Sequence, residues 1–467
     1  MDYICNAAIK AYMRFISFAL IFSCFLSTAI YSQYSTYGIT NARNMGMANV
    51  YTATSYGLYS VHINPSLLAK ERLNGNKQRF SLMLPNVSAQ AYNKDVVLDA
   101  INYFTETRPI EIVRDIDPEK IMNALEMGGR IYLDGSFGYM SFGYSPSEKI
   151  GSFAFSMNDI IKTVIILPKV AVDVIEDPDK TGGTISLNEL SMNTVWLRSY
   201  TVSYGREIDI RQEGVDGVYV GGALNYYNGF LYSLIDVKSS VSLELGDEFL
   251  FGLTYKADVI SSSSEDFSMP LPKPTGRGFG LDIAGSIEFT KGVTVGLAFT
   301  DIGSIKWTGN TRKREMEGVI RIDSNTTLED IRSYFDSVNV ITTDENEFRS
   351  QAPTTMRCGF AFRIDKMVGK FPGRMTAALD IDQDISVNES RDLIPRFALG
   401  LEWKPGNYWP VFLTGISYDR YGQRRMALGL GYELKFLEIY FSTAEVAPWL
   451  GGGRDMFSAS LTTVWYF

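Results

Sequence analysis

The last thirteen residues of the chain, Asp455 to Phe467, alternate between two kinds of side chain. Successive side chains of a β-strand point to opposite faces, so every second residue back from the end shares a face. One face is mainly apolar and consists of Phe457, Ala459, Leu461, Thr463, Trp465 and Phe467. The other face is mainly small or hydroxylic. A strand of about ten residues with two such faces suits a barrel in a bilayer, and the last strand of a soluble sandwich is the alternative.

The same alternation recurs along the body of the chain, for example in segments 278–290, 293–300, 396–404 and 424–435. Its polar face is rich in Gly, Ala and Thr, with charged side chains placed singly. That composition favours a curved wall around a lumen over a soluble sandwich, although both folds alternate. We expect these charged residues to face the lumen: Asp282, Glu288, Arg396, Glu402, Arg425 and Glu433.

Connection lengths alternate as well, and outer-membrane barrels have short turns on the periplasmic side and longer loops outside. Tight turns are expected near Lys435, Lys291–Gly292 and Gly246. Long outer loops are expected at 93–130, 176–191, 261–276 and 305–352. We therefore predict an all-β fold, a transmembrane antiparallel up-and-down barrel over residues 74–467.

The strand count from these patterns is sixteen, within an error of two. Segments 216–227, 233–245 and 248–259 are counted as three separate strands, and Tyr227–Leu231 is unusually short for the outer loop that this count requires. Helical patterns inside the long loops occur at Asp117–Met127 and Thr327–Val338, each after an N-cap residue. Aromatic residues near strand ends indicate interfacial girdles: Trp196, Trp307, Trp403, Tyr408, Trp409, Trp465, Tyr466 and Phe467.

Residues 1–32 have the features of an export signal: a positive start, an apolar run and then small residues. Cleavage is expected after Ala29 or after Ser32. Met1 and Met13 are both candidate starts. A lipoprotein signal at Cys24 is disfavoured by the bulky residue two positions before it. No other stretch reaches the roughly 18 apolar residues of a membrane-spanning helix, so an exported chain of this kind is either soluble outside the inner membrane or a barrel.

Composition excludes several other functions. The formal charge is −9, which gives no basic surface for nucleic acid. Export would leave Cys358 as the only cysteine, and His62 is the only histidine, so we expect no enzyme, no cofactor and no metal. Three alternating aspartates, Asp380, Asp382 and Asp384, lack the glycine and distal glutamate of a calcium loop. We interpret them as part of a wet lumen or rim.

The segment between the leader and the first strand, residues 37–73, is rich in small residues, amides and methionines. Its most distinctive residues are Ala42, Arg43, Met45, Gly46, Met47, Tyr51, Thr52, Ala53, Asn64, Pro65, Leu67, Leu68 and Ala69. In this spacing they resemble the segment before strand one of the FadL superfamily of outer-membrane barrels, and within it the PorV-like branch. Ala48-Asn49 replaces a glycine pair of that family, and Ile63 replaces an aromatic residue.

The resemblance implies a bacterial outer-membrane barrel of fourteen strands, with residues 33–73 as a plug in its lumen. The plug residues would include Arg43, Met45, Gly46, Met47, His62, Asn64 and Pro65. Implied partners are outer-membrane lipid and either a hydrophobic small molecule, which would pass through, or secretion-machinery proteins. An open porin and a protein-interaction barrel without transport are alternatives, and residues 37–73 as a periplasmic linker is another. A plug is physically reasonable because a barrel of this size leaves an open interior.

Overall fold

The computed structural model describes residues 40–70, 79–92, 130–166, 183–186, 191–210, 212–245, 249–264, 272–322, 339–344, 346–385, 395–418, 424–450 and 456–467. The leader at 1–32 and the helices predicted at Asp117–Met127 and Thr327–Val338 lie outside these residues. Within the described parts of the chain, no helix is both long and apolar enough to cross a membrane.

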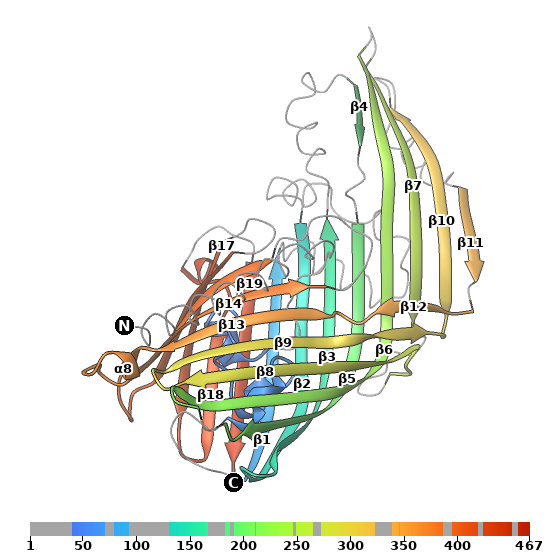
Figure 1. Ribbon diagram of the computed structural model, residues 1–467. Coiled ribbons are helices and arrows are strands. Elements are labelled where there is room, and N and C mark those ends of the chain that lie inside the picture. The colour runs from blue at the N-terminus through green and yellow to red at the C-terminus, as the bar shows by residue number, and fades with distance from the viewer. Residues whose placement is uncertain are drawn as a thin grey trace, which may run out of the picture.

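Fourteen antiparallel strands form a closed barrel (Figure 1). Each strand of the ring pairs with the next, and β1 pairs with both β2 and β19, which closes the cylinder. The strands of the ring are β1 (Phe80–Tyr92), β2 (Arg130–Ser147), β3 (Gly151–Ile166), β5 (Ser191–Ile208), β6 (Val215–Leu245), β8 (Gly276–Phe289), β9 (Val293–Trp307), β13 (Thr355–Arg363), β14 (Arg374–Asp384), β15 (Arg396–Lys404), β16 (Val411–Tyr418), β17 (Arg424–Glu433), β18 (Leu437–Thr443) and β19 (Met456–Tyr466).

Burial alternates along these strands as a bilayer requires. In β15, Phe397 and Leu399 are exposed, whereas Arg396, Ala398 and Glu402 are buried. The last strand repeats the pattern, with exposed phenylalanine, leucine and tryptophan alternating with buried serine and threonine. A closed ring with an apolar outer face and a polar inner face is a transmembrane barrel, because lipid covers the outside and every backbone group in the wall pairs with a neighbouring strand.

The strand count of sixteen is wrong by two, and the fourteen strands implied by the resemblance are correct. Segments 216–227 and 233–245 form one continuous strand, β6, in which one extra residue between Gly229 and Leu231 shifts the register against β5. Segment 248–259 belongs to β7 (Phe249–Ser263), which pairs with the far half of β6 instead of entering the ring.

The far half of β6 forms a second, small sheet that projects beyond the ring (Figure 1). Its other strands are β4 (Gly183–Ser186), β7, β10 (Thr311–Ile322) and β11 (Asn339–Asp344). β12 (Phe348–Gln351) leads back to the ring beside β9. The connection predicted as a loop at 305–352 therefore contains the end of β9 and three further strands. The strand β6 starts among the short turns and ends at this projection, and Gly246, where a tight turn was expected, lies outside the described residues.

The short connections share one end of the barrel, here called the turn end, with the start of β1 and the end of β19. Gly292 adopts φ +77 in the β8–β9 turn, a conformation that favours glycine. The β13–β14 connection contains the short helix α8 (Ile364–Met367). At the opposite, outer end lie the projecting sheet and the β18–β19 connection, which contains the 3₁₀ turn η4 (Ala447–Leu450).

Residues 40–70, here called the N-terminal segment, lie inside the ring (Figure 1, blue). They form α2 (Ala42–Gly46) and the 3₁₀ turns η1 (Gly57–Ser60) and η2 (Pro65–Ala69). α2 contacts β1 and β16 to β19, whereas η2 contacts β3, β5, β6 and β8 on the other side of the ring. Nearly all residues of the segment are buried, so it occupies the lumen as a folded unit.

Candidate functional site: the N-terminal segment and the inner wall

Local sequence determines the two helical pieces of the segment that contact the wall. The side chain of Asn41 caps α2 by accepting a hydrogen bond from the backbone N–H of Asn44. Asn64 caps η2 in the same way through Ser66, and Pro65 occupies the first position of that turn. Proline suits this position because its fixed φ is already helical and no backbone donor is needed there. The Asn-Pro pair of the predicted plug residues is thus a helix start.

A wall side chain binds the backbone carbonyl oxygens of the turn that follows α2. Ala48 and Asn49 both have left-handed φ values, 56 and 57, which directs their carbonyl groups towards β15. Arg396 donates to both carbonyl oxygens at 2.7 Å, and its guanidinium is also paired with Asp382. Left-handed backbone is unfavourable for alanine, so the arginine stabilises a strained turn.

Asp380 of β14 binds the next stretch of the segment. One carboxylate oxygen accepts hydrogen bonds from the backbone N–H groups of Tyr51 and Thr52 and from the Thr52 hydroxyl, each at 2.8 Å. Asp380 and Asp382 are fully buried. These aspartates face the lumen, as interpreted, but the expectation of a wet surface is wrong at Asp380, because the N-terminal segment covers this residue and uses it as an acceptor.

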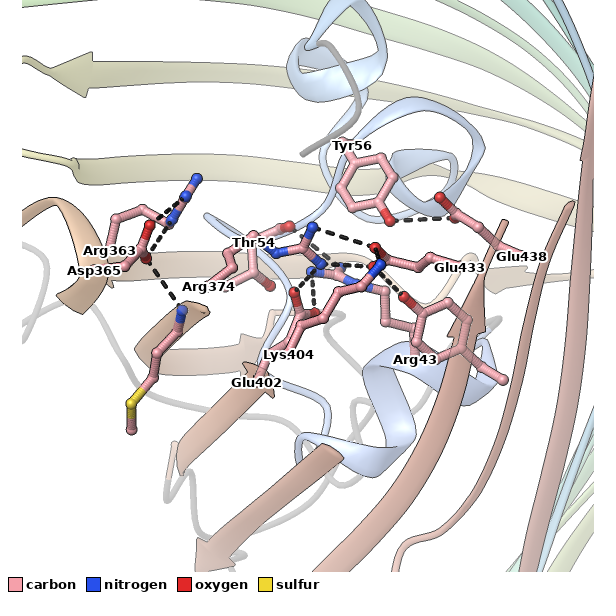
Figure 2. Close-up of polar contacts among 12 residues, drawn as sticks. Arg43, Thr54, Tyr56, Arg363, Asp365, Arg374, Glu402, Lys404, Glu433 and Glu438 are labelled. Carbon is pink, nitrogen blue, oxygen red and sulfur yellow. Dashed lines mark hydrogen bonds and ion pairs between the residues drawn. The ribbon is translucent and has the colours of Figure 1, made fainter. Parts of the chain in front are cut away.

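Arg43 of α2 enters a buried charged cluster (Figure 2). Its guanidinium is 2.7 Å from the carboxylate of Glu402 and donates to the carbonyl oxygen of Thr54 at 3.2 Å. It also lies over the ring of Tyr56, 4.8 Å from the centroid, and 5.8 Å from that of Tyr59. A planar cation suits this position because it can pair with a carboxylate while its face contacts aromatic rings.

The charges of this cluster balance only when Arg43 is present. On the wall, Arg374 contacts Glu402 at 3.2 Å and Glu433 at 2.6 Å, and Lys404 contacts Glu433 at 2.9 Å. The Tyr56 hydroxyl donates to Glu438 at 3.2 Å. The wall therefore contributes three carboxylates and two cations, and the segment supplies the third cation. Buried charges are stable only when paired, so the cluster favours the docked segment.

His62 lies in a polar niche formed by β3 and β5. Its Nε2 atom accepts from the Asn158 amide at 3.0 Å and contacts the Ser156 hydroxyl at 2.7 Å. Its Nδ1 atom is 3.4 Å from the hydroxyl of Thr201. Burial lowers the pKa of His62 to about 3, and the charge of Arg357 contributes in the same direction. The imidazole is therefore neutral at physiological pH and acts as a hydrogen-bonding residue of the segment.

Asn64 joins two parts of the segment to the wall. Its amide donates to the carbonyl oxygen of Thr52 at 2.6 Å and to the hydroxyl of Ser286 at 2.9 Å. Ser66 contacts the same Ser286 hydroxyl at 2.8 Å. At the end of the segment, Lys70 pairs with Glu288 at 3.0 Å.

Glycines of the inner wall allow the backbone of the segment to approach closely. A Cβ atom at Gly415 would lie 2.6 Å from the Met47 carbonyl carbon, and one at Gly296 would lie 2.6 Å from the Thr52 carbonyl oxygen. The same holds at Gly221 against Pro65, at 2.5 Å. Distances under 3 Å are incompatible with a side chain, so these positions fit only glycine while the segment is in place.

The residues predicted to face the lumen have different partners. Glu288, Arg396 and Glu402 contact the segment directly, and Glu433 is part of the charged cluster. Asp282 is buried and accepts from the Asn225 amide at 2.8 Å. Arg425 lies over the ring of Tyr132, 5.0 Å from its centroid, close to the apolar group in which Met45 packs. Gly46 packs its backbone against Gly429, and Met47 is part of the main apolar cluster.

An apolar cluster at the outer end of the lumen was not predicted. Trp307 was expected in an interfacial girdle, and this is wrong, because the side chain points inward, is fully buried and donates to the Ser350 hydroxyl at 2.9 Å. The cluster is completed by aromatic and aliphatic side chains: Leu197, Tyr227, Tyr232, Ile305, Phe348 and Ala352. Gly229 and Gly276 leave room for the indole, and because they belong to β6 and β8 while Trp307 belongs to β9, no local sequence signal marks this cluster.

Fold and site together define a class: a closed fourteen-stranded transmembrane barrel with its N-terminal segment folded in the lumen. The family described as "Family of unknown function (DUF5723)" matches residues 73–444, and the chain belongs to this family. No curated protein sequence matches the chain.

Solved structures with a similar fold include FadL-family barrels, the family that residues 37–73 resemble, and the PorV-like branch stays a prediction. The P. putida toluene transporter TodX is 13% identical over 91% of this chain and 98% of its own, with a TM-score of 0.46. The Ralstonia pickettii toluene transporter TbuX is 11% identical over 91% and 98%, with a TM-score of 0.43. A Pseudomonas aeruginosa FadL homologue is 10% identical over 92% and 99%, with a TM-score of 0.25. These likenesses are remote and concern the fold alone.

Proposed function

We propose that this chain is a bacterial outer-membrane barrel through which an apolar small molecule passes, with residues 40–70 as the plug of its lumen. The observation that carries the proposal is the set of buried polar contacts between the segment and the wall, from Arg43 with Glu402 to Asp380 with the backbone at Tyr51. A linker outside the barrel would not form these specific contacts with side chains of the inner wall.

Polar anchoring suits a plug that also has to move. Asp380, Arg396 and Glu402 bind the segment through hydrogen bonds and ion pairs, which water can replace when the segment leaves. A ring of this size has an open lumen unless something fills it. Residues 40–70 lie in this lumen, so the proposal disfavours an open porin. Hydrogen-bonded closure combines a tight seal with a release that exchanges one set of polar partners for another.

The apolar character of the solute is inferred from the cluster around Trp307 at the outer end of the lumen. Its inward aromatic side chains are packed together, with ring centroids of Tyr232 and Trp307 at 5.3 Å and of Trp307 and Phe348 at 6.1 Å. Binding sites for small apolar molecules are typically lined by such side chains with a few polar groups. Toluene is the solute in the description of TodX and TbuX, and we restrict the proposal here to the class of apolar small molecules.

The test is uptake of a hydrophobic solute into proteoliposomes, with and without residues 34–73. We expect the intact chain to take up solute without passing a steady ion current, and the shortened chain to pass a large current in planar bilayers. If neither form takes up solute faster than empty liposomes, transport is refuted. If the intact chain already passes a large steady current, the plug is refuted.

A second candidate is a secretion-associated role, in which the barrel docks proteins instead of passing a solute. The observation in its favour is the sheet of β6, β7, β10 and β11, which projects beyond the ring at the outer end. Replacing residues 236–258 and 315–341 by short turns would remove most of this sheet. Loss of a secreted protein from the cell surface with uptake unchanged would favour docking, and loss of uptake alone would favour transport.

A further inference from the structure

Three basic residues stand side by side across three strands near the outer end of the barrel. In the register of the sheet, Lys306 of β9 is directly opposite Arg277 of β8 on one side and Arg349 of β12 on the other. We call these three residues the basic row. Residues directly opposite have Cβ atoms about 5 Å apart, and like charges in that position destabilise a sheet. An arrangement that lowers stability needs another explanation.

The row carries excess positive charge among the described residues. Glu347 pairs with Lys306 at 2.5 Å and is itself half exposed. No described side chain is paired with Arg277 or Arg349 in a hydrogen bond or ion pair, so among the described side chains three cations share one carboxylate, a formal charge of +2.

The row faces the outside of the barrel. Alternation places neighbouring residues on the opposite face, and these neighbours point inward: Gly276 contacts Trp307, whose indole donates to Ser350. Arg277 and Arg349 are exposed, and the side chain of Lys306 is 42% exposed. The charges are therefore on the side of the wall that the bilayer covers.

The row also lies at a defined depth. Below it on the same face of β8 run exposed apolar side chains, beginning with Phe279 at 71% exposure and ending with Phe289 beside the turn end. Eleven tilted strand residues cover about 25 Å, the height of the apolar band of outer-membrane barrels. The ring of Tyr226 is 5.2 Å from that of Phe279 and marks the same level. The basic row is thus just beyond the apolar band, where lipid headgroups lie.

We propose that the basic row binds the phosphate groups of an anionic lipid in the outer leaflet. Arginine pairs with phosphate through two parallel hydrogen bonds, and lysine adds a point charge between the two arginines. A phosphate in front of the row relieves the repulsion within it and competes with Glu347 for Lys306. This lipid site is outside the wall and does not depend on the plug or on transport.

The test compares two triple variants in nanodiscs of phosphatidylcholine with a minor fraction of an anionic phospholipid. The first replaces Arg277, Lys306 and Arg349 by Gln. The matched control replaces three exposed cations at the turn end: Arg206, Lys291 and Lys370. Native mass spectrometry of the released protein measures the bound anionic lipid. We expect binding to weaken by about tenfold in the first variant and by less than about twofold in the control.

Glu347→Gln gives a test of opposite sign, because it frees Lys306 and should strengthen binding of the anionic lipid. Inorganic phosphate at the same ionic strength as sodium chloride should displace no more lipid than chloride does, since a single free anion lacks the membrane anchor. Equal lipid binding by the row variant and the intact chain overturns the proposal, as does equal loss in the control. Displacement by free phosphate alone would reassign the site to a soluble anion. Solute uptake by the row variant is measured separately, so a failure of the lipid proposal can be distinguished from a failure of the transport proposal.

Discussion

Replacing Arg43 by methionine should release the N-terminal segment from the barrel. The guanidinium is fully buried, lies 2.7 Å from Glu402 and contacts the rings of Tyr56 and Tyr59. Methionine fills similar volume without charge, so among the described residues the buried carboxylate of Glu402 keeps one cationic partner, Arg374, at 3.2 Å. The substitution therefore removes one charge from a balanced cluster.

The expected magnitude follows from the cost of leaving a buried charge with fewer partners. Breaking a buried ion pair by removing one partner costs about 3–5 kcal/mol. Arg374 and water entering the lumen compensate in part, so we take the lower end. About 3 kcal/mol corresponds to a shift of roughly a hundredfold in the ratio of docked to released segment.

Limited proteolysis with chymotrypsin measures this ratio, because the segment carries three buried tyrosines, Tyr51, Tyr56 and Tyr59. Cleavage that requires release follows the released population when docking is fast relative to cleavage. We expect Arg43→Met to be cut roughly a hundred times faster than the intact chain and to pass more current in planar bilayers.

Two controls separate this effect from general destabilisation. Arg198→Met removes an equally buried arginine of β5, which pairs with Asp159 of β3 at 2.6 Å within the wall. We expect it to leave tyrosine cleavage unchanged. The double variant Arg43→Met with Glu402→Leu should recover much of the docking, because no unpaired charge remains. Unchanged cleavage and current in Arg43→Met would show that the charge balance does not hold the segment.

Three further predictions concern other contacts of the segment. Acidification from pH 7.5 to 5.5 should weaken docking by about 1.4 kcal/mol, because the pKa of His62 is about 3 when docked and about 6.5 when released. The contribution of the neutral imidazole to docking is therefore fully present above about pH 6.5 and decreases as the pH falls. Proteolysis of His62→Asn should lack this dependence on pH. Asp380→Ala leaves two backbone N–H groups without an acceptor and should weaken docking by about 2 kcal/mol, whereas Asp384→Ala, on the same strand face, should have less effect in the same assay. Gly415→Val should prevent docking while the barrel still folds, and a heat-resistant barrel on electrophoresis with full chymotrypsin sensitivity would be the result to look for.

The barrel could be predicted from the sequence because strand alternation has a period of two and each face meets a different solvent. Phe397 and Leu399 alternate with Arg396 and Glu402 whether or not the neighbouring strands are known. Strand pairing is different, since it depends on residues far away in the chain. Asn228-Gly229 inside β6 reads as a turn, yet the strand continues through it with one extra residue because β5 pairs on both sides.

Of the two parts of the candidate site, the N-terminal segment could be predicted from the sequence and its partners on the wall could not. The residue pattern of the N-terminal segment identified Arg43, His62 and Asn64 as residues of interest, because they belong to one short stretch. Their partners are distributed over the wall, and Asp380 is 329 positions from Tyr51, to which it is bonded. No local pattern distinguishes an aspartate that accepts backbone N–H groups from one that faces water.

The composition of the inner face has a more specific cause than curvature. Glycine, alanine and threonine on the polar face favour a lumen, and that inference is correct for the fold. Six of the inner-wall glycines, however, coincide with the path of the segment: Gly400 and Gly415 lie against Met47, Gly296 and Gly359 against Thr52, and Gly205 and Gly221 against Pro65. A water-filled lumen would accept a side chain at each of these positions. The wall is therefore glycine-rich where another backbone touches it, and its sequence matches the shape of the docked segment.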